Sequence, residues 1–153
     1  MAALEEMILQ ALITLLVAAL LYAFSRAFEL YLIKPYYNFK REVIETKIDL
    51  LFYRNILTAS LEKETTNKEF IGKARDCQEK IRSRWSRVSV RYEVVPKWMF
   101  SRKLPTNKEI KMIEENLIYL SNRSIFKRDS VPDDCVNSDK KINEILKIFK
   151  KTI

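Results

Sequence analysis

MILQALITLLVAALLYAF, from Met7 to Phe24, is a run of eighteen residues without a charged side chain. A helix of this length rises by about 27 Å, close to the ~30 Å thickness of the hydrocarbon core of a bilayer. Ala27, Phe28 and most residues of 30–33 extend the apolar surface beyond it. The sequence therefore predicts an N-terminal transmembrane helix, with residues 1–34 as the anchor and its extension.

The charges on either side of this run predict its orientation. Glu5 and Glu6 precede it, whereas the first basic residues, Arg26 and Lys34, follow it. Because lysine and arginine are retained on the cytoplasmic side of a membrane, we expect residues 35–153 to form a cytoplasmic domain of a single-pass cell-membrane protein.

A cleaved secretory signal peptide is the alternative interpretation of the same apolar run. Ala23, Phe24 and Ser25 resemble a small-residue cleavage site. A signal peptide, however, begins with a basic segment, and no lysine or arginine precedes the apolar run here. The flanking charges therefore favour an anchor that is not cleaved.

The part of the chain after the apolar run is strongly basic. All 28 lysines and arginines lie there with 18 of the 20 acidic residues, so its net charge is 28 − 18 = +10. A balance of this kind favours anionic partners such as lipid headgroups or nucleic acid. We expect the anionic inner leaflet as the main partner; a protein partner or a second copy stays open, and nucleic acid is less favoured.

The residue types that are missing argue against most enzyme classes. The chain has no histidine, which removes the usual nucleophile triads and the common zinc motifs. Its single glycine, Gly72, cannot form a Gly-rich phosphate loop. Cys77 and Cys135 are too few for a zinc cluster, and we expect both to be thiols in a reducing cytoplasm. We predict no catalytic residue, no cofactor and no metal site.

Helical spacing of apolar residues over most of the chain predicts an all-α fold, with the anchor helix followed by a bundle of about four helices. The first helix should end near Lys34, because Pro35 disfavours helical geometry at the preceding residue. The second should run from about Asn38 to Leu61. It carries one apolar stripe through Phe39, Val43, Leu50, Leu57 and Leu61 and another through Ile44, Ile48 and Leu51. Two apolar faces predict a central, buried helix.

Capping boxes mark the start of the next two helices. Residues 66–69 and 106–109 both read Thr-Asn-Lys-Glu, in which the threonine and the glutamate cap each other's backbone N–H groups. After the second box, apolar side chains lie on one helical face at Ile110, Ile113, Leu117 and Leu120. After Ser138 a last helix carries Ile142, Ile145, Leu146 and Phe149. The polar segment 130–137 is expected to be a loop.

The third helix has the sharpest pattern. Its apolar stripe consists of Phe70, Ala74, Cys77, Ile81, Trp85, Val88, Tyr92 and Val95. A basic line lies about 90° to one side and consists of Lys73, Lys80, Arg84, Arg87 and Arg91. If the second and third helices form an antiparallel hairpin, Asp49, Glu45 and Glu42 come opposite Lys80, Arg84 and Arg87. Neutralisation between these helices, binding of anionic lipid and binding of nucleic acid are the three interpretations.

Residues 97–100, Lys-Trp-Met-Phe, form a second feature of interest between Pro96 and Arg102. Large apolar side chains next to basic ones suit a loop in the membrane interface, with tryptophan at headgroup depth. Aromatic side chains after a helix also commonly close a bundle core, and both roles stay open.

The chain resembles an uncharacterised family of small prokaryotic single-pass membrane proteins with an N-terminal anchor and a helical cytoplasmic domain. The resemblance rests on Ile33-Lys34-Pro35-Tyr36-Tyr37, Leu51-Phe52-Tyr53-Arg54-Asn55, Val95-Pro96-Lys97-Trp98 and Leu117-Ile118-Tyr119-Leu120-Ser121-Asn122. It implies the same order of elements and no catalytic residue.

Taken together, these patterns predict a non-enzymatic, membrane-anchored helical adaptor or scaffold. The residues expected to contact lipid headgroups are Arg26, Lys34, Lys40, Arg41, Arg87, Arg91, Lys97, Trp98, Arg102 and Lys103. One alternative is a membrane-acting effector, a toxin or defence component that oligomerises through its anchor by way of Gln10 and Thr14. The other is a membrane-tethered nucleic-acid binder.

Overall fold

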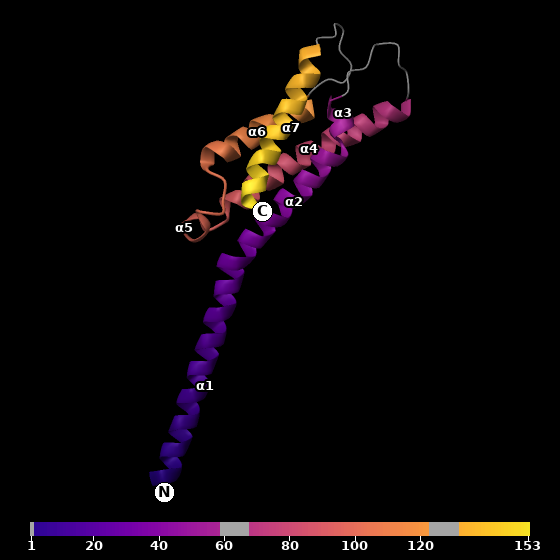
Figure 1. Cartoon of the computed structure of the whole chain (residues 1–153). Helices are drawn as coiled ribbons and strands as arrows, with labels where there is room; N and C mark the ends of the chain where they lie inside the picture. The colour runs from indigo at the N-terminus through magenta and orange to yellow at the C-terminus, as the bar shows by residue number, and fades with distance from the viewer. Residues whose placement is uncertain (1, 59–67, 123–131) are drawn as a thin grey trace.

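The computed structural model describes residues 2–58, 68–122 and 132–153, and within these residues the chain is all-α. The elements in chain order are α1 (Ala2–Phe28), the π-helical turn η1 (Glu29–Ile33), α2 (Lys34–Phe52), α3 (Arg54–Thr58), α4 (Lys68–Glu93), α5 (Lys97–Phe100), α6 (Asn107–Asn122) and α7 (Pro132–Thr152). Figure 1 shows two parts, a long rod formed by α1 and a helical bundle above it. This confirms the predicted fold class.

The rod and the bundle share one helix, because α1, η1 and α2 follow one another without a break. The prediction that the first helix ends near Lys34 is therefore wrong. A proline inside a helix lacks an N–H group, and its ring collides with the carbonyl four residues earlier. The π-helical turn places an extra residue in the turn before Pro35 and relieves this collision, with the Lys34 N–H donating to the Glu29 carbonyl.

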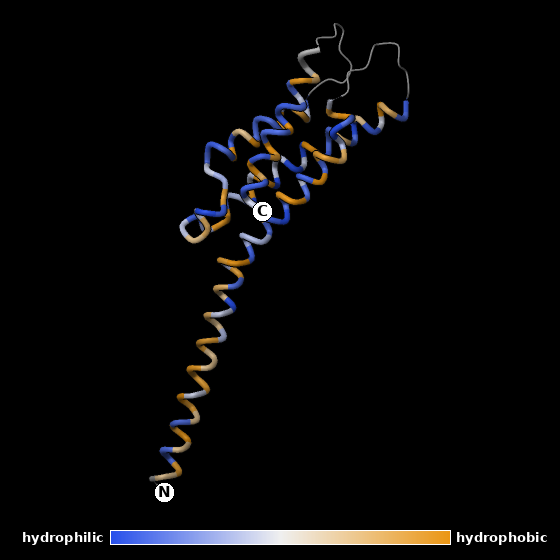
Figure 2. Tube along the Cα trace, in the orientation of Figure 1, coloured by the Kyte–Doolittle hydropathy of each residue, from blue (hydrophilic) through white to orange (hydrophobic). Residues whose placement is uncertain are grey.

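Helix α1 stands clear of the rest of the protein, and Figure 2 shows hydrophobic residues along most of its length. The large apolar side chains from Leu4 to Phe24 are between 48% and 74% exposed. No part of the apolar stretch is buried against another described element, and by length and composition the helix can cross a membrane. A core helix of a soluble domain would instead have one face covered.

The bundle consists of α2, α4, α6 and α7, each antiparallel to the helix before it. The Phe39 ring on α2 lies 5.6 Å from the Tyr92 ring on α4, and contacts between α4 and α6, α6 and α7, and α7 and α2 complete the ring. The shared core contains the predicted apolar stripe of α6 and that of α4 from Cys77 onward, with Trp85 partly buried against it, whereas Phe70 and Ala74 lie outside this core. Its largest fully buried side chains include Phe39, Leu50, Ile81, Ile113, Leu117, Leu120, Ile142, Ile145 and Phe149.

Helix α2 differs from its prediction at its end and on its outer face. It ends at Phe52, and α3 turns away so that Leu57 is buried and Arg54 contacts Asp139 of α7 at 2.7 Å. The stripe that includes Ile44 and Ile48 is exposed rather than buried. Helix α2 is thus not central, because four helices around one core give each helix only one inward face. Leu61 lies outside the described residues.

Helix α7 begins earlier than its apolar spacing predicts. Its helical backbone starts at Pro132, so a loop over 130–137 is wrong from that residue onward. Proline suits the first position of a helix, because its fixed φ angle is helical and the N–H group that it lacks has no partner there in any case. Residues 130 and 131 lie outside the described residues.

The second capping box forms as predicted at the start of α6. The Glu109 N–H donates to the Thr106 hydroxyl oxygen at 3.2 Å, and the Thr106 N–H donates to the Glu109 carboxylate at 2.9 Å. In the first box, Thr66 and Asn67 lie outside the described residues.

We expect Thr106→Ala to lower the free energy of unfolding by about 1 kcal/mol, since the substitution removes one half of the reciprocal cap. Thr106→Ser keeps a hydroxyl group at this position and should stay within a few tenths of a kcal/mol of the wild type. Urea denaturation followed by circular dichroism measures both variants. Equal losses would contradict a capping role for the hydroxyl group.

Candidate functional site

The end of the bundle nearest α1 brings together five segments that are distant in sequence. They are the start of α2, the end of α4, α5, the start of α6 and the end of α7. The Tyr92 hydroxyl donates to the Pro105 carbonyl at 2.9 Å, and the Lys151 amine donates to the Glu109 carboxylate at 3.0 Å. These contacts hold the end of α4, the start of α6 and the end of α7 together at the same end of the bundle.

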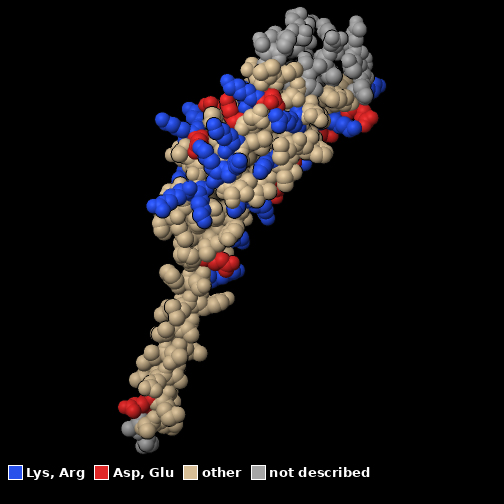
Figure 3. All heavy atoms as spheres, in the orientation of Figure 1, with Lys and Arg blue, Asp and Glu red and all other residues tan. Residues whose placement is uncertain are grey.

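This end of the bundle is basic, and we call it the basic collar. Residues 34–41, 87–111 and 147–153 contain thirteen lysines and arginines but only two acidic residues, Glu93 and Glu109. In Figure 3, basic side chains gather on the part of the bundle nearest the rod. The antiparallel order of the helices creates this concentration from charges that are spread along the sequence.

Nine of the ten residues predicted to contact lipid lie in the basic collar. The tenth, Arg26, lies before the collar on the same continuous helix. Arg26 is on α1, where it pairs with Glu29 at 2.7 Å, and the others lie on α2, α4, α5 and the turn after α5. All are exposed except Lys40, which is half-buried. The prediction omitted five lysines that join the collar, namely Lys108, Lys111, Lys147, Lys150 and Lys151. Had the last two helices been predicted to pack antiparallel, these five lysines would have been expected at the same end of the bundle.

Helix α5 shows one of the two roles expected for residues 97–100, and the role in a membrane interface stays a prediction. Phe100 stacks on Tyr36, with ring centroids 4.2 Å apart and planes 7° apart, so it closes the core. Trp98, in contrast, is 76% exposed. Successive side chains of a helix diverge by about 100°, which explains why Phe100 is packed while Trp98, in the same turn, is exposed. Lys97 lies over the Tyr92 ring, 4.5 Å from its centroid.

A shallow groove of about 360 Å³ lies below the basic collar, where α1 meets α2. It is lined by Arg26, Glu29, Leu30, Ile33, Lys34 and Tyr37. Two cations and two aliphatic side chains thus lie side by side around the π-helical turn. This mixture suits the boundary between apolar and ionic surroundings.

Where the basic line of α4 faces α2, its cations form ion pairs with carboxylates of α2. Arg84 is only 12% exposed and donates to Asp49 at 2.6 Å, to Glu42 at 2.8 Å and to Glu45 at 2.6 Å. Burial alone would lower the pKa of Arg84. The hydrogen bonds to the three carboxylates raise it by more than burial lowers it, so the pKa lies above its ordinary value and the guanidinium stays charged. We call these four residues the Arg84 cluster.

The Arg84 cluster confirms most of the predicted charge pairing between α2 and α4. Lys80 adds a contact to Asp49 at 3.1 Å. Arg87, however, forms no ion pair among the described residues, because Arg84 already takes the Glu42 carboxylate. The bidentate geometry of a guanidinium lets one arginine reach several carboxylates at once.

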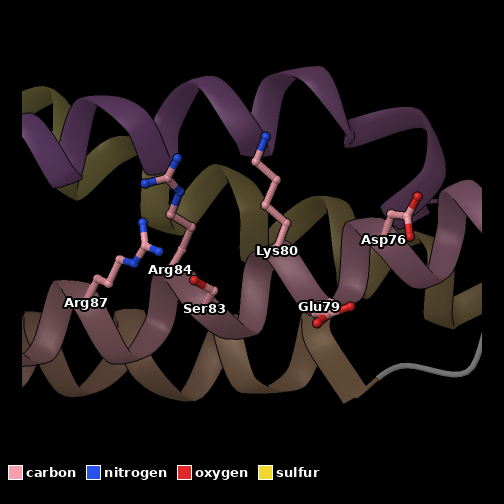
Figure 4. A pocket seen from close by; sticks show the side chains of 6 residues that line it. All are labelled: Asp76, Glu79, Lys80, Ser83, Arg84 and Arg87. Atoms are coloured by element: carbon pink, nitrogen blue, oxygen red, sulfur yellow. The ribbon is translucent and has the colours of Figure 1, made fainter.

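Figure 4 shows the open side of this region, a pocket of about 310 Å³ beside α4. Lys80 and Arg84 extend from α4 toward α2, and Asp76 and Glu79 also line the pocket. Since α2 carboxylates neutralise both cations, the pocket offers an anion little net positive charge. Of the basic line of α4, Lys73 pairs with Glu69, and the side chains that remain available are Arg87 and Arg91 near its end, in the basic collar.

Reactive groups elsewhere in the described residues are few. Cys77 is fully buried, and burial together with the charge of Asp49 raises the pKa of its thiol to about 12. A thiol with such a pKa is protonated at neutral pH and is a poor nucleophile. In the described part of the chain, no three histidine, cysteine, aspartate or glutamate side chains are placed to hold a metal ion.

Comparison of the chain with models of protein families, with curated proteins and with solved structures found no match. The resemblance to small single-pass membrane proteins stays a prediction. The rod, the basic collar and the Arg84 cluster are therefore the features of this protein that bear on its function.

Replacing Arg84 by methionine should lower the free energy of unfolding by about 3–5 kcal/mol, because it leaves buried carboxylates without their cation. Arg87→Met removes a similar side chain one turn away that has no ion pair among the described residues. That control should change the free energy by less than about 0.5 kcal/mol. Chemical denaturation measures both, and similar effects would contradict the structural role of the Arg84 cluster.

Glu109 gives a pH-dependent prediction. Its hydrogen bonds to Thr106, followed by that to Lys151, hold the pKa of this carboxyl below the ordinary value of 4.5. A lowered pKa stabilises the folded state above the unfolded pKa, and this contribution disappears as the pH falls through the folded pKa. The wild type should therefore be more stable than Glu109→Gln at pH 7, and the difference should shrink below about pH 4.5. A difference that does not change between pH 7 and pH 3 would contradict this linkage.

Proposed function

We propose that the protein is a single-pass membrane protein whose cytoplasmic four-helix bundle serves as a non-enzymatic adaptor or scaffold. The observation that carries the proposal is that none of the large apolar side chains of α1 from Leu4 to Phe24 is buried. The bundle has its own closed core and covers none of that surface.

Free energy supports a bilayer as the surroundings of α1. Each large apolar side chain left in water instead of buried costs about 1.5–3 kcal/mol. Leu4, Phe24 and the large apolar side chains between them are all about half exposed or more. Their combined cost exceeds the ~5–15 kcal/mol by which a typical small domain is stable. A lipid environment removes this cost and leaves the bundle unchanged.

The basic collar supports a cytoplasmic orientation. Lys34 follows Arg26 by eight residues, or about 12 Å along a helix, which places the collar just beyond the headgroups that Arg26 reaches. Each lysine or arginine close to an anionic leaflet contributes about 1 kcal/mol, and the attraction decays over a Debye length of about 8 Å. Trp98, exposed and flanked by basic residues, suits headgroup depth.

Two other functions receive less support from the structure. For a nucleic-acid binder, the basic line of α4 would have to be available, yet Lys80 and Arg84 are occupied by α2 carboxylates. For an effector that oligomerises inside the membrane, Thr14 would hydrogen-bond to a neighbouring helix. Its hydroxyl hydrogen already donates to the Gln10 carbonyl of its own helix at 2.8 Å, which leaves only the acceptor sites of the oxygen for a second helix.

Membrane fractionation tests the anchor. We expect the full-length chain to stay in the membrane pellet after a carbonate wash at high pH, which releases proteins that are bound only by charge. Leu12→Lys together with Leu16→Lys should move the chain into the supernatant, because a charge at the bilayer centre costs about 2.5–3.5 kcal/mol on insertion scales. A wild-type chain in the supernatant would refute the proposal.

The fluorescence of Trp98 tests the contact between the basic collar and lipid. In a Trp85→Phe background, we expect vesicles with one third phosphatidylglycerol to protect Trp98 from an aqueous quencher several-fold better than neutral vesicles. High salt should remove the difference. Stronger protection in the anionic vesicles would support contact between the collar and headgroups. Equal protection in both vesicle types would exclude that contact.

A matched pair of charge reversals completes this test. Changing Lys97, Arg102 and Lys103 to glutamate should abolish the protection. Changing Lys68, Arg75 and Lys140 to glutamate alters the net charge equally at exposed positions in the part of the bundle far from α1, and should leave the protection unchanged.

A further inference from the structure

The outer face of α2 is an apolar surface without a described partner. Tyr37 is 63% exposed, Ile44 36%, Ile48 58%, Leu51 47% and Phe52 76%. The opposite face of the same helix packs into the bundle core. Figure 1 shows α2 along one edge of the bundle, directly continuous with the rod. We call these five residues the α2 outer face.

The spacing of the α2 outer face is that of a two-stranded coiled coil. Tyr37, Ile44 and Leu51 recur every seven residues, and Ile48 lies between the last two at steps of four and three. In heptad notation the first three are d positions, whereas Ile48 and Arg41 are a positions. A seam of alternating a and d residues is the pattern by which parallel helices pack knobs into holes.

We propose that the α2 outer face pairs with the same face of a second copy of this chain, as a parallel two-stranded coiled coil. The parallel direction rests on the proposed membrane anchor, since two copies in one membrane with one orientation hold their α2 helices side by side and pointing the same way. Confinement to a membrane also raises the effective concentration of the second copy. The unbroken helix from α1 to α2 transmits that alignment.

Charges beside the seam fit this arrangement. In a parallel coiled coil, a g residue faces the e residue five positions later on the other chain. Lys40 occupies g and Glu45 occupies e, so a symmetric dimer forms this pair twice. Glu45 is 40% exposed even though it accepts from Arg84 and pairs with Arg41 at 3.7 Å, and each carboxylate oxygen has a further acceptor site. The next g residue, Lys47, faces Phe52 and can cover it with its aliphatic stem.

The bilayer is not a suitable occupant of this face. Ile48 follows Arg26 by 22 residues, or about 33 Å along a helix, which is beyond the reach of headgroups. The polar Arg41 at an a position also favours a defined partner, because a single polar residue in such a seam fixes the register and the number of strands.

Cross-linking in membranes tests the pairing. The full-length chain carries Cys135→Ser and one introduced cysteine, either Ile48→Cys or the control Val90→Cys on α4. Val90 is 59% exposed, which matches Ile48 at 58%. Cys77 is fully buried and should not react. With a short bismaleimide, we expect at least a five-fold higher yield of dimer from Ile48→Cys than from Val90→Cys.

A charge reversal provides the second measurement. Lys40→Glu places a negative charge opposite Glu45 of the second copy and should lower the Ile48→Cys dimer yield several-fold. Lys140→Glu makes the same charge change at an exposed position far from the seam and should leave the yield unchanged.

The outcomes separate this proposal from the membrane anchor. Equal dimer yields from both cysteines, in chains that remain in the membrane pellet, would overturn the coiled coil and leave the anchor in place. An Ile48→Cys product of another mass would identify a different protein as the partner and would also overturn it. A chain found in the supernatant would refute the anchor and the parallel pairing together.

Discussion

One continuous helix, from α1 through η1 into α2, is the constraint on which the rest of this structure depends. The π-helical turn before Pro35 lets the helix pass a residue that would otherwise end it. The exposed apolar rod and the first helix of the bundle are therefore one element. The bundle is therefore joined to the rod by continuous helical backbone rather than by a non-helical linker.

The antiparallel packing on α2 also separates the cations of the chain into a paired group and an exposed group. Where α4 faces α2, Lys80 and Arg84 meet carboxylates and are neutralised. At the end nearest the rod, the turns and helix ends place thirteen cations against two acidic residues. One basic sequence thus yields a charge cluster that stabilises the bundle and a free basic collar. The collar, the exposed Trp98 and the groove around Arg26 lie next to the surface proposed to enter the bilayer.

Much of the fold could be predicted from local patterns. The apolar stripe of α4, the cap at Thr106 and the pairing of α4 cations with α2 carboxylates all follow from helical periodicity and hydrogen-bond chemistry. The end of α2 at Phe52 could not be predicted, since Arg54 turns α3 toward Asp139, 85 residues later in the chain. Of the basic collar, the sequence supplied the α2, α4 and α5 members. The lysines of α6 and α7 join only through packing.

The sequence by itself determined the helical class, the uncharged run of α1 and the excess of positive charge, because each of these properties depends on neighbouring residues alone. Only the tertiary structure decided which apolar face of α2 is buried, which arginine takes the α2 carboxylates and which side chain of α5 closes the core. In each case more side chains could be buried or paired than the closely packed interior can hold. Which of them are buried or paired therefore depends on how all the helices pack together.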